Sequence, residues 1–128
     1  AEGIGLHAAV DYLDDVGLER IQRHEEQLAE YAHDRLTEYD DVTVFGPPGD
    51  ERVGLVSFDL EGVHPHDVSQ ILDDHGVAVR AGDHCTQPLH DRMDVPGSVR
   101  ASFYVYNTTE EVDRLVEAID DARELFAV

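Results

Sequence analysis

The sequence contains no lysine and no tryptophan, and it has a single cysteine, Cys85, in 128 residues. One cysteine excludes an intramolecular disulfide, so the fold cannot depend on a disulfide framework. No apolar run approaches the roughly 20 residues that a membrane-spanning helix needs, and no signal-peptide pattern opens the chain. We therefore expect a soluble, cytoplasmic protein that folds around a hydrophobic core.

Positive charge is scarce, because only nine arginines accompany 29 aspartate and glutamate residues, and the formal net charge is -20. Nucleic acids and anionic membranes bind basic surfaces, so neither is expected as a partner. Acidic residues spread along every helix are typical of a surface adapted to high salt, where screening weakens the repulsion between like charges. We therefore expect a halophilic protein.

The length is that of one ordinary domain, and the apolar pattern predicts its elements. Residues at helical spacing predict helices at 1–15, 18–39, 64–76 and 108–126, whereas β-branched or alternating runs predict strands at 42–45, 53–60, 77–80 and 99–106. Gly76 is expected to end the third helix in a left-handed conformation, and Thr108 with Glu111 forms a capping-box pattern. The order ααββαββα indicates an α+β fold with a small, mostly antiparallel sheet of about four strands and helices packed largely on one face.

The second predicted helix is clearly amphipathic. The stripe that we expect to face the core consists of Leu18, Ile21, Leu28, Ala32, Leu36 and Tyr39. The histidines outside the cysteine region lie among acidic or turn residues and are expected to face solvent: His24, His33, His64, His66 and His75.

Residues 77–88 read Val-Ala-Val-Arg-Ala-Gly-Asp-His-Cys-Thr-Gln-Pro, a short β-type run followed by polar and turn-forming residues. A lone cysteine is most often a small buried hydrophobe. Here the polar neighbours place Cys85 on a loop instead, with His84 beside it and Arg80 nearby. Such a setting lowers the pKa of a thiol and keeps it accessible, which favours a reactive role for Cys85.

A metal site is the main alternative for this segment. Five potential ligands lie within nine residues, namely Asp83, His84, Cys85, His90 and Asp91. Three consecutive ligands on an extended loop point in different directions, and no C-x-x-C or H-x-x-x-H pair supports them, so we predict no metal site. A cysteine protease is a weaker possibility, because no orienting group or oxyanion hole is recognisable.

Arg100 is the second residue of interest, because it occupies a polar position within the alternating run of the last predicted strand. The apolar residues Val99 and Ala101 flank it, so its side chain should project from the opposite face of the sheet. An arginine there either forms a surface ion pair or grips a carboxylate with two parallel hydrogen bonds. The residues alone leave both possibilities open.

The segments Val-Ala-Val-Arg-Ala-Gly-Asp-His-Cys-Thr-Gln-Pro-Leu and Val-Arg-Ala-Ser-Phe-Tyr-Val-Tyr-Asn-Thr-Thr-Glu-Glu-Val-Asp together resemble the SUF-type cysteine desulfurases. The resemblance extends to Ile4-Gly5-Leu6 and Phe45-Gly46-Pro47, and so covers nearly the whole chain. These enzymes belong to the pyridoxal-phosphate-dependent class V aminotransferases, and the match is to their C-terminal small domain, residues 1–128. Residues 1–17 would then be an inter-domain helix.

The resemblance implies that Cys85 is the nucleophile, which takes sulfur from L-cysteine to leave L-alanine and a persulfide on Cys85. It further implies that Arg100 holds the substrate carboxylate and that Arg80 and His84 support the loop. Asn107 also matches a family motif, without an assigned role. Where the family has His-His-Cys, this chain has Asp83 before His84, and the added negative charge should oppose thiolate formation.

The resemblance also implies partners outside this chain: a sulfur-acceptor protein of the SUF iron–sulfur assembly system, and a second subunit in a homodimer. Pyridoxal phosphate is held through a lysine, and this chain has none, so we expect the chain alone neither to hold the cofactor nor to turn over cysteine. Selenocysteine lyase and cysteine sulfinate desulfinase are alternative activities. A non-catalytic thiol or metal-binding module is the alternative from another class.

Overall fold

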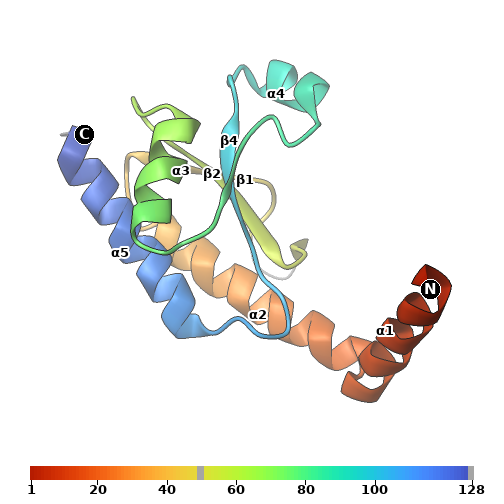
Figure 1. The fold of residues 1–128 in the computed structure, drawn as a ribbon. Helices are drawn as coiled ribbons and strands as arrows, with labels where there is room; N and C mark the ends of the chain where they lie inside the picture. The colour runs from red at the N-terminus through yellow and green to blue at the C-terminus, as the bar shows by residue number, and fades with distance from the viewer. Residues whose placement is uncertain (49–50, 127–128) are drawn as a thin grey trace.

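The computed structural model describes residues 1–48 and 51–126 and contains helices around one small sheet (Figure 1). The elements are α1 (Glu2–Val16), α2 (Leu18–Leu36), β1 (Val42–Phe45), β2 (Leu55–Leu60), α3 (Pro65–Asp74), β3 (Arg80–Gly82), α4 (Gln87–Met93), β4 (Ser98–Ser102) and α5 (Thr109–Phe126). This arrangement confirms the predicted α+β class and element order. The one addition is the short helix α4, which follows β3.

The sheet has four strands in the order β1-β2-β4-β3, and every neighbouring pair is antiparallel. The last strand in the sequence, β4, is therefore central, between β2 and the short edge strand β3. The strand predicted at 77–80 lies later in the structure, at Arg80–Gly82, because only these residues pair with β4. The strand predicted at 99–106 ends at Ser102, where the pairing with β2 also ends.

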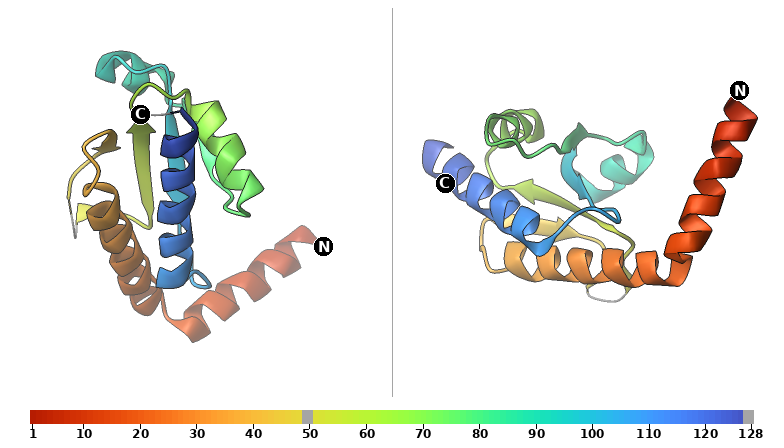
Figure 2. Two further views of the ribbon diagram at one scale, coloured as in Figure 1. Left: turned by 90° about the vertical axis from the view of Figure 1, so that its left-hand side faces the viewer. Right: turned by 60° about the horizontal axis from the view of Figure 1, so that its bottom comes forward.

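The core lies on one face of the sheet, beneath α2, α3 and α5 (Figure 2). In β2 the side chains of Val56, Phe58 and Leu60 alternate inward, as their spacing predicts, and all three are buried. The buried residues that these helices contribute are Leu28, Ala32, Leu36, Val68, Leu72, Val112, Leu115, Ile119 and Ala122. The described part of the chain therefore has a single continuous core of its own.

The opposite face of the sheet carries polar side chains in register. Ser57 on β2 pairs with Arg100 on β4, and Arg100 pairs in turn with Arg80 on β3. Directly paired residues of antiparallel strands project from the same face, so these three residues form a row across the sheet. Arg100 thus projects away from the core, as the alternation predicts.

Local signals set the ends of the helices that flank the site. His64 caps α3, since its Nδ1 accepts a hydrogen bond from the His66 backbone N–H at 3.2 Å, and Gly76 follows the helix with φ +74° as predicted. In α4, proline occupies the first turn and Asp94 ends the helix in a left-handed conformation. Seven residues without a full apolar stripe are too few for periodicity to reveal, which explains why α4 was not predicted.

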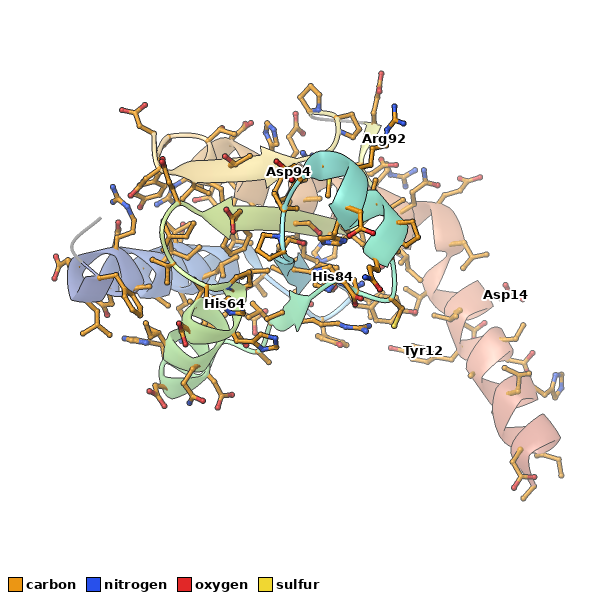
Figure 3. The ribbon with its side chains drawn as sticks, turned by 90° about the horizontal axis from the view of Figure 1, so that it is seen from above. Tyr12, Asp14, His64, His84, Arg92 and Asp94 are labelled. Carbon is orange, nitrogen blue, oxygen red and sulfur yellow. The ribbon has the colours of Figure 1, made fainter. Side chains whose placement is uncertain are left out.

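Helix α1 lies apart from the rest of the fold and has no buried residue (Figures 1 and 2). Gly17, at φ +93°, separates it from α2. The expectation that Leu18 joins the core stripe of α2 is wrong, because its side chain is 60% exposed at this bend. Figure 3 shows Tyr12 and Asp14 on α1 well away from the sheet. Within residues 1–48 and 51–126, no helix has the length and apolar character to cross a membrane.

Candidate active site around Cys85

Cys85 lies in a tight turn between β3 and α4, and its side chain is exposed. His84 and Cys85 both adopt left-handed conformations, with φ values of 53° and 64°, which cost a non-glycine residue about 1–2 kcal/mol each. Asp83 stabilises the turn, because its Oδ1 accepts a hydrogen bond from the Cys85 backbone N–H at 3.0 Å. Thr86 closes the turn by donating its hydroxyl proton to the Asp83 carbonyl oxygen at 2.7 Å.

The Arg80 guanidinium contacts the sulfur of Cys85. Its Nη2 donates a hydrogen bond to Sγ at 3.3 Å, from the strand immediately before the loop. The contact joins the edge strand β3 to the loop while the sulfur stays exposed. The structure therefore brings together two residues that the sequence singled out.

Arg100 lies directly opposite Arg80 across the β3–β4 pair. Neither arginine forms an ion pair with a carboxylate among the described residues, although the protein is rich in acids. Like charges on opposed strand positions repel each other, so the pair is a locally positive spot that favours an anion. Arg100 Nε is buried and has no hydrogen-bond partner within the described part of the chain.

A pocket of about 360 Å³ lies on the polar face of the sheet beneath α4. Its walls are largely apolar, and its polar lining groups come from β2, the cysteine loop, α4 and β4. The lining residues are Phe45, Gly46, Leu55, Ser57, His84, Thr86, Leu89, His90, Met93, Ser98 and Arg100. Arg100 and His84 therefore share one cavity.

His84 occupies the inner side of the loop. Its Nε2 lies 3.0 Å from the hydroxyl of Ser98, and its Nδ1 is buried without a partner in the described residues. Burial lowers the pKa of His84, and the positive charge of Arg100 and the neighbouring His90 and Arg80 lower it further. The neutral ring is thus the favoured form near neutral pH. Figure 3 shows His84 below α4, which carries Arg92.

Ser98 and His90 are part of this site but were not predicted as such. Ser98 is 1% exposed and His90 is 4% exposed, and His90 Nε2 lies 3.1 Å from Ser98 Oγ. From the sequence, His90 is only a potential metal ligand and Ser98 has no predicted role. A polar serine at the start of an otherwise buried strand was the available signal.

Four of the five potential metal ligands of this segment, Asp83, His84, Cys85 and His90, make other contacts. Asp83 binds a backbone N–H, and His84 and His90 both contact Ser98. Across residues 1–48 and 51–126, no three His, Cys, Asp or Glu side chains are grouped so that they could hold a metal ion.

The expectation that the remaining histidines face solvent is partly wrong. His24 is half-buried, with Nε2 3.0 Å from the Asn107 carbonyl oxygen, and the side chain of His33 is only 16% exposed. Long-range packing of α2 near the start of α5 produces the His24 contact, which sequence neighbours cannot show. Asn107 itself braces the turn before α5, since its Oδ1 accepts a hydrogen bond from the Tyr104 backbone N–H.

Of the two hydrogen bonds of a capping box, the described residues before α5 form the one that the Glu111 side chain accepts from the Thr108 backbone. Glu111 Oε2 accepts a hydrogen bond from the Thr108 backbone N–H at 3.0 Å and another from Asn107 Nδ2 at 2.9 Å.

Comparison with known proteins places this geometry in a family. The profile of the aminotransferase class-V family matches residues 1–115. This chain belongs to the aminotransferase class-V family. It is 68% identical over 127 residues to a cysteine desulfurase from Haloferax volcanii, covering 99% of this chain and 30% of that protein. It is 63% identical to a probable cysteine desulfurase from Halobacterium salinarum, covering 99% of this chain and 31% of that protein.

Solved structures give the same family assignment. The apo cysteine desulfurase from Thermococcus onnurineus is 42% identical with a TM-score of 0.89, covering 93% of this chain and 30% of that one. The cysteine desulfurase CsdA from Escherichia coli, solved as an S-sulfonic acid, is 39% identical with a TM-score of 0.88, covering 95% of this chain and 30% of that one. This class-V aminotransferase chain thus spans about 30% of the length of the relatives it matches.

Proposed function

We propose that this chain is the part of a cysteine desulfurase that accepts sulfur from L-cysteine, with Cys85 as the nucleophile. The observation that carries the proposal is the Arg80 guanidinium 3.3 Å from the exposed sulfur. A thiolate stabilised by a charged donor and open to solvent is the reactive form of cysteine. The names of the relatives support the reaction class.

The chemistry assigned to Cys85 is a sulfur transfer. The Cys85 thiolate attacks the sulfur of the substrate, the carbon–sulfur bond of L-cysteine breaks, and its electron pair stays with the carbon. A proton taken up at that carbon completes L-alanine. The transferred sulfur remains on Cys85 as a persulfide.

Arg100 is proposed to bind the substrate carboxylate. It projects from the middle of β4 into the pocket beneath α4, and it forms no ion pair within the described residues. A planar guanidinium can donate two parallel hydrogen bonds to a carboxylate, which fixes the substrate's orientation as well as its position. Arg80 would then stabilise the thiolate, and His84 would order the inner side of the loop.

Asp83 has a structural role that its charge alone does not suggest. Its carboxylate accepts the Cys85 backbone N–H and so helps to hold the left-handed turn. The Asp83 carboxylate thus contacts the backbone of Cys85, whereas Arg80 contacts its sulfur.

Pyridoxal phosphate, the cofactor of this family, does not fit this chain as a covalently held group. The chain has no lysine to form the bond that anchors it. We therefore propose that the cofactor is bound by the remainder of the longer protein and that this chain alone is inactive. The role of this chain is to present the thiol and the carboxylate clamp to a site completed elsewhere.

Three further parts of the proposal concern partners and domains. We propose that the persulfide passes to a sulfur-acceptor protein of the SUF iron–sulfur assembly system, and the exposure of Cys85 supports such a transfer. We propose that residues 1–17 link this domain to the rest of the protein, since α1 has no buried residue within the described fold. The full-length protein is proposed to be a homodimer.

The test uses the cofactor-loaded full-length protein and its Cys85→Ser variant. After incubation with L-cysteine and peptide mapping by mass spectrometry, we expect the Cys85 peptide of the unchanged protein to be heavier by one sulfur atom. We expect Cys85→Ser to carry no added sulfur and to release no sulfide under reducing conditions. Full sulfide release from Cys85→Ser would refute the assignment of the nucleophile.

The same preparation separates the other activities. L-selenocysteine and L-cysteine sulfinate are assayed beside L-cysteine, with alanine as the common product. A kcat/KM clearly higher for either competitor would make this chain part of a selenocysteine lyase or a cysteine sulfinate desulfinase. No alanine from any of the three substrates, together with bound metal by elemental analysis, would indicate a non-catalytic metal-binding module.

A further inference from the structure

A buried serine hydroxyl lies between two histidine rings on the polar face of the sheet. Ser98 Oγ is 3.0 Å from His84 Nε2 and 3.1 Å from His90 Nε2. The two rings meet edge to face, with centroids 5.7 Å apart. Ser98 and His90 have no role in the sulfur transfer proposed above, yet both are almost fully buried.

The second nitrogen of His90 determines the direction of these hydrogen bonds. His90 Nδ1 lies 3.3 Å from the Thr86 carbonyl oxygen and 3.4 Å from Thr86 Oγ. A carbonyl can only accept, and the single Thr86 hydroxyl proton is already donated to the Asp83 carbonyl oxygen. Both Thr86 oxygens therefore act as acceptors towards His90, so the proton of the neutral ring is on Nδ1.

The position of the His90 proton also fixes the direction of the hydrogen bond between Ser98 and His84. Because the Nε2 of a neutral His90 is unprotonated, it accepts the hydroxyl proton of Ser98. Ser98 has only that one proton, so towards His84 its oxygen accepts, and the His84 proton is on Nε2. His84 Nδ1 is consequently an unprotonated nitrogen with a free lone pair.

Two side chains of the pocket beneath α4 each have a buried nitrogen without a partner in the described residues. These nitrogens are His84 Nδ1 and Arg100 Nε, and the second is a donor. Both side chains line the pocket beneath α4, and the charge of Arg100 acts on the pKa of His84. The two nitrogens form no hydrogen bond with each other, and an unprotonated Nδ1 carries no N–H that would oppose the positive charge of the guanidinium.

We propose that Ser98 and His90 are positioning residues that hold His84 in the Nε2–H tautomer, so that its buried Nδ1 offers a lone pair, and not an N–H, in the pocket that it shares with Arg100. The tautomer does not depend on the proposed functions of Cys85 and Arg100. Ser98 and His90 act only through His84.

The experiment measures the tautomer directly in the 128-residue chain, which has its own core. In 15N-labelled protein at pH 8, above the usual histidine range, long-range proton–nitrogen spectra distinguish a protonated from an unprotonated ring nitrogen. We expect His84 to be protonated on Nε2 alone. Ser98→Ala removes the acceptor and should populate the Nδ1–H form, whereas Ser98→Thr keeps a hydroxyl and should restore the original spectrum.

Two results would overturn the proposal: an Nδ1–H His84 in the unchanged chain, or an identical His84 spectrum in Ser98→Ala. Amide spectra of each variant control for folding, and His90→Phe, which removes the other neighbour of the hydroxyl, gives a second way of disturbing the same hydrogen bonds. This measurement needs no turnover, so it remains informative even if Cys85 proves not to be the nucleophile.

Discussion

The close approach of Gly97 to Gly82 supports a specific prediction for the cysteine loop. Gly97 is buried just before β4, and Gly82, at φ +118°, is the last residue of β3 before Asp83. A methyl group added at Gly97 would lie 3.2 Å from three backbone atoms of Gly82. That distance is shorter than ordinary van der Waals contact, and backbone cannot move aside as a flexible side chain can.

We therefore expect Gly97→Ala to destabilise the fold by about 1–3 kcal/mol, the usual cost of overpacking. With a urea m-value of about 1–3 kcal/mol per molar for a small protein, the unfolding midpoint should fall by roughly 1 M. Because Gly82 leads directly into the cysteine loop, moving its backbone should also shift the loop. The contact between Arg80 and Cys85 should therefore weaken. The rate at which Cys85 reacts with a disulfide reagent should change accordingly.

Gly5→Ala is the matched control, because a Cβ there meets nothing within 4 Å and the residue lies in the isolated helix α1. Alanine favours a helix over glycine by about 0.8–1 kcal/mol, so this variant should be as stable as the unchanged chain or slightly more so. Gly82→Ala tests backbone conformation instead of space, since its Cβ is unobstructed but its φ is positive. Equal unfolding midpoints and equal thiol reactivity for Gly97→Ala and Gly5→Ala would refute the reasoning.

Three other predictions concern charge and cofactor. Contacts with the Ile71 carbonyl and Asp121 raise the pKa of His75 in the folded state, so the resulting stabilisation is full below the unfolded pKa and is lost as pH rises through the folded one. Urea midpoints of the unchanged chain should therefore fall between pH 6 and pH 8 by more than those of His75→Gln, and equal slopes would contradict this. Because the net charge is -20, the melting temperature should rise between low and molar potassium chloride; a melting temperature independent of salt would argue against a halophilic surface. After incubation with pyridoxal phosphate and borohydride reduction, mass spectrometry should find no adduct on any internal side chain, and a stable internal adduct would show that the missing lysine does not prevent covalent binding.

Much of the fold follows from local pattern. The alternation of Val56, Phe58 and Leu60 predicted both a strand and its buried face, because a strand must present alternate residues to the core. Proline at the start of α3 and Gly76 after it marked both ends of that helix for steric reasons. Leu18 was assigned to the core wrongly, because periodicity shows which residues share a face and not whether a neighbouring element covers that face.

The sequence by itself determined that the only thiol is Cys85, that it lies on a polar loop after a strand, and that no lysine is available to hold a cofactor. These are properties of composition and local order. Tertiary structure alone decided that Arg80 contacts the sulfur, that Arg100 lies directly opposite Arg80, and that Ser98 lies between His84 and His90. Strand register and the placement of α4 produce these contacts, and both result from burying the whole core at once, which no local stretch of sequence encodes.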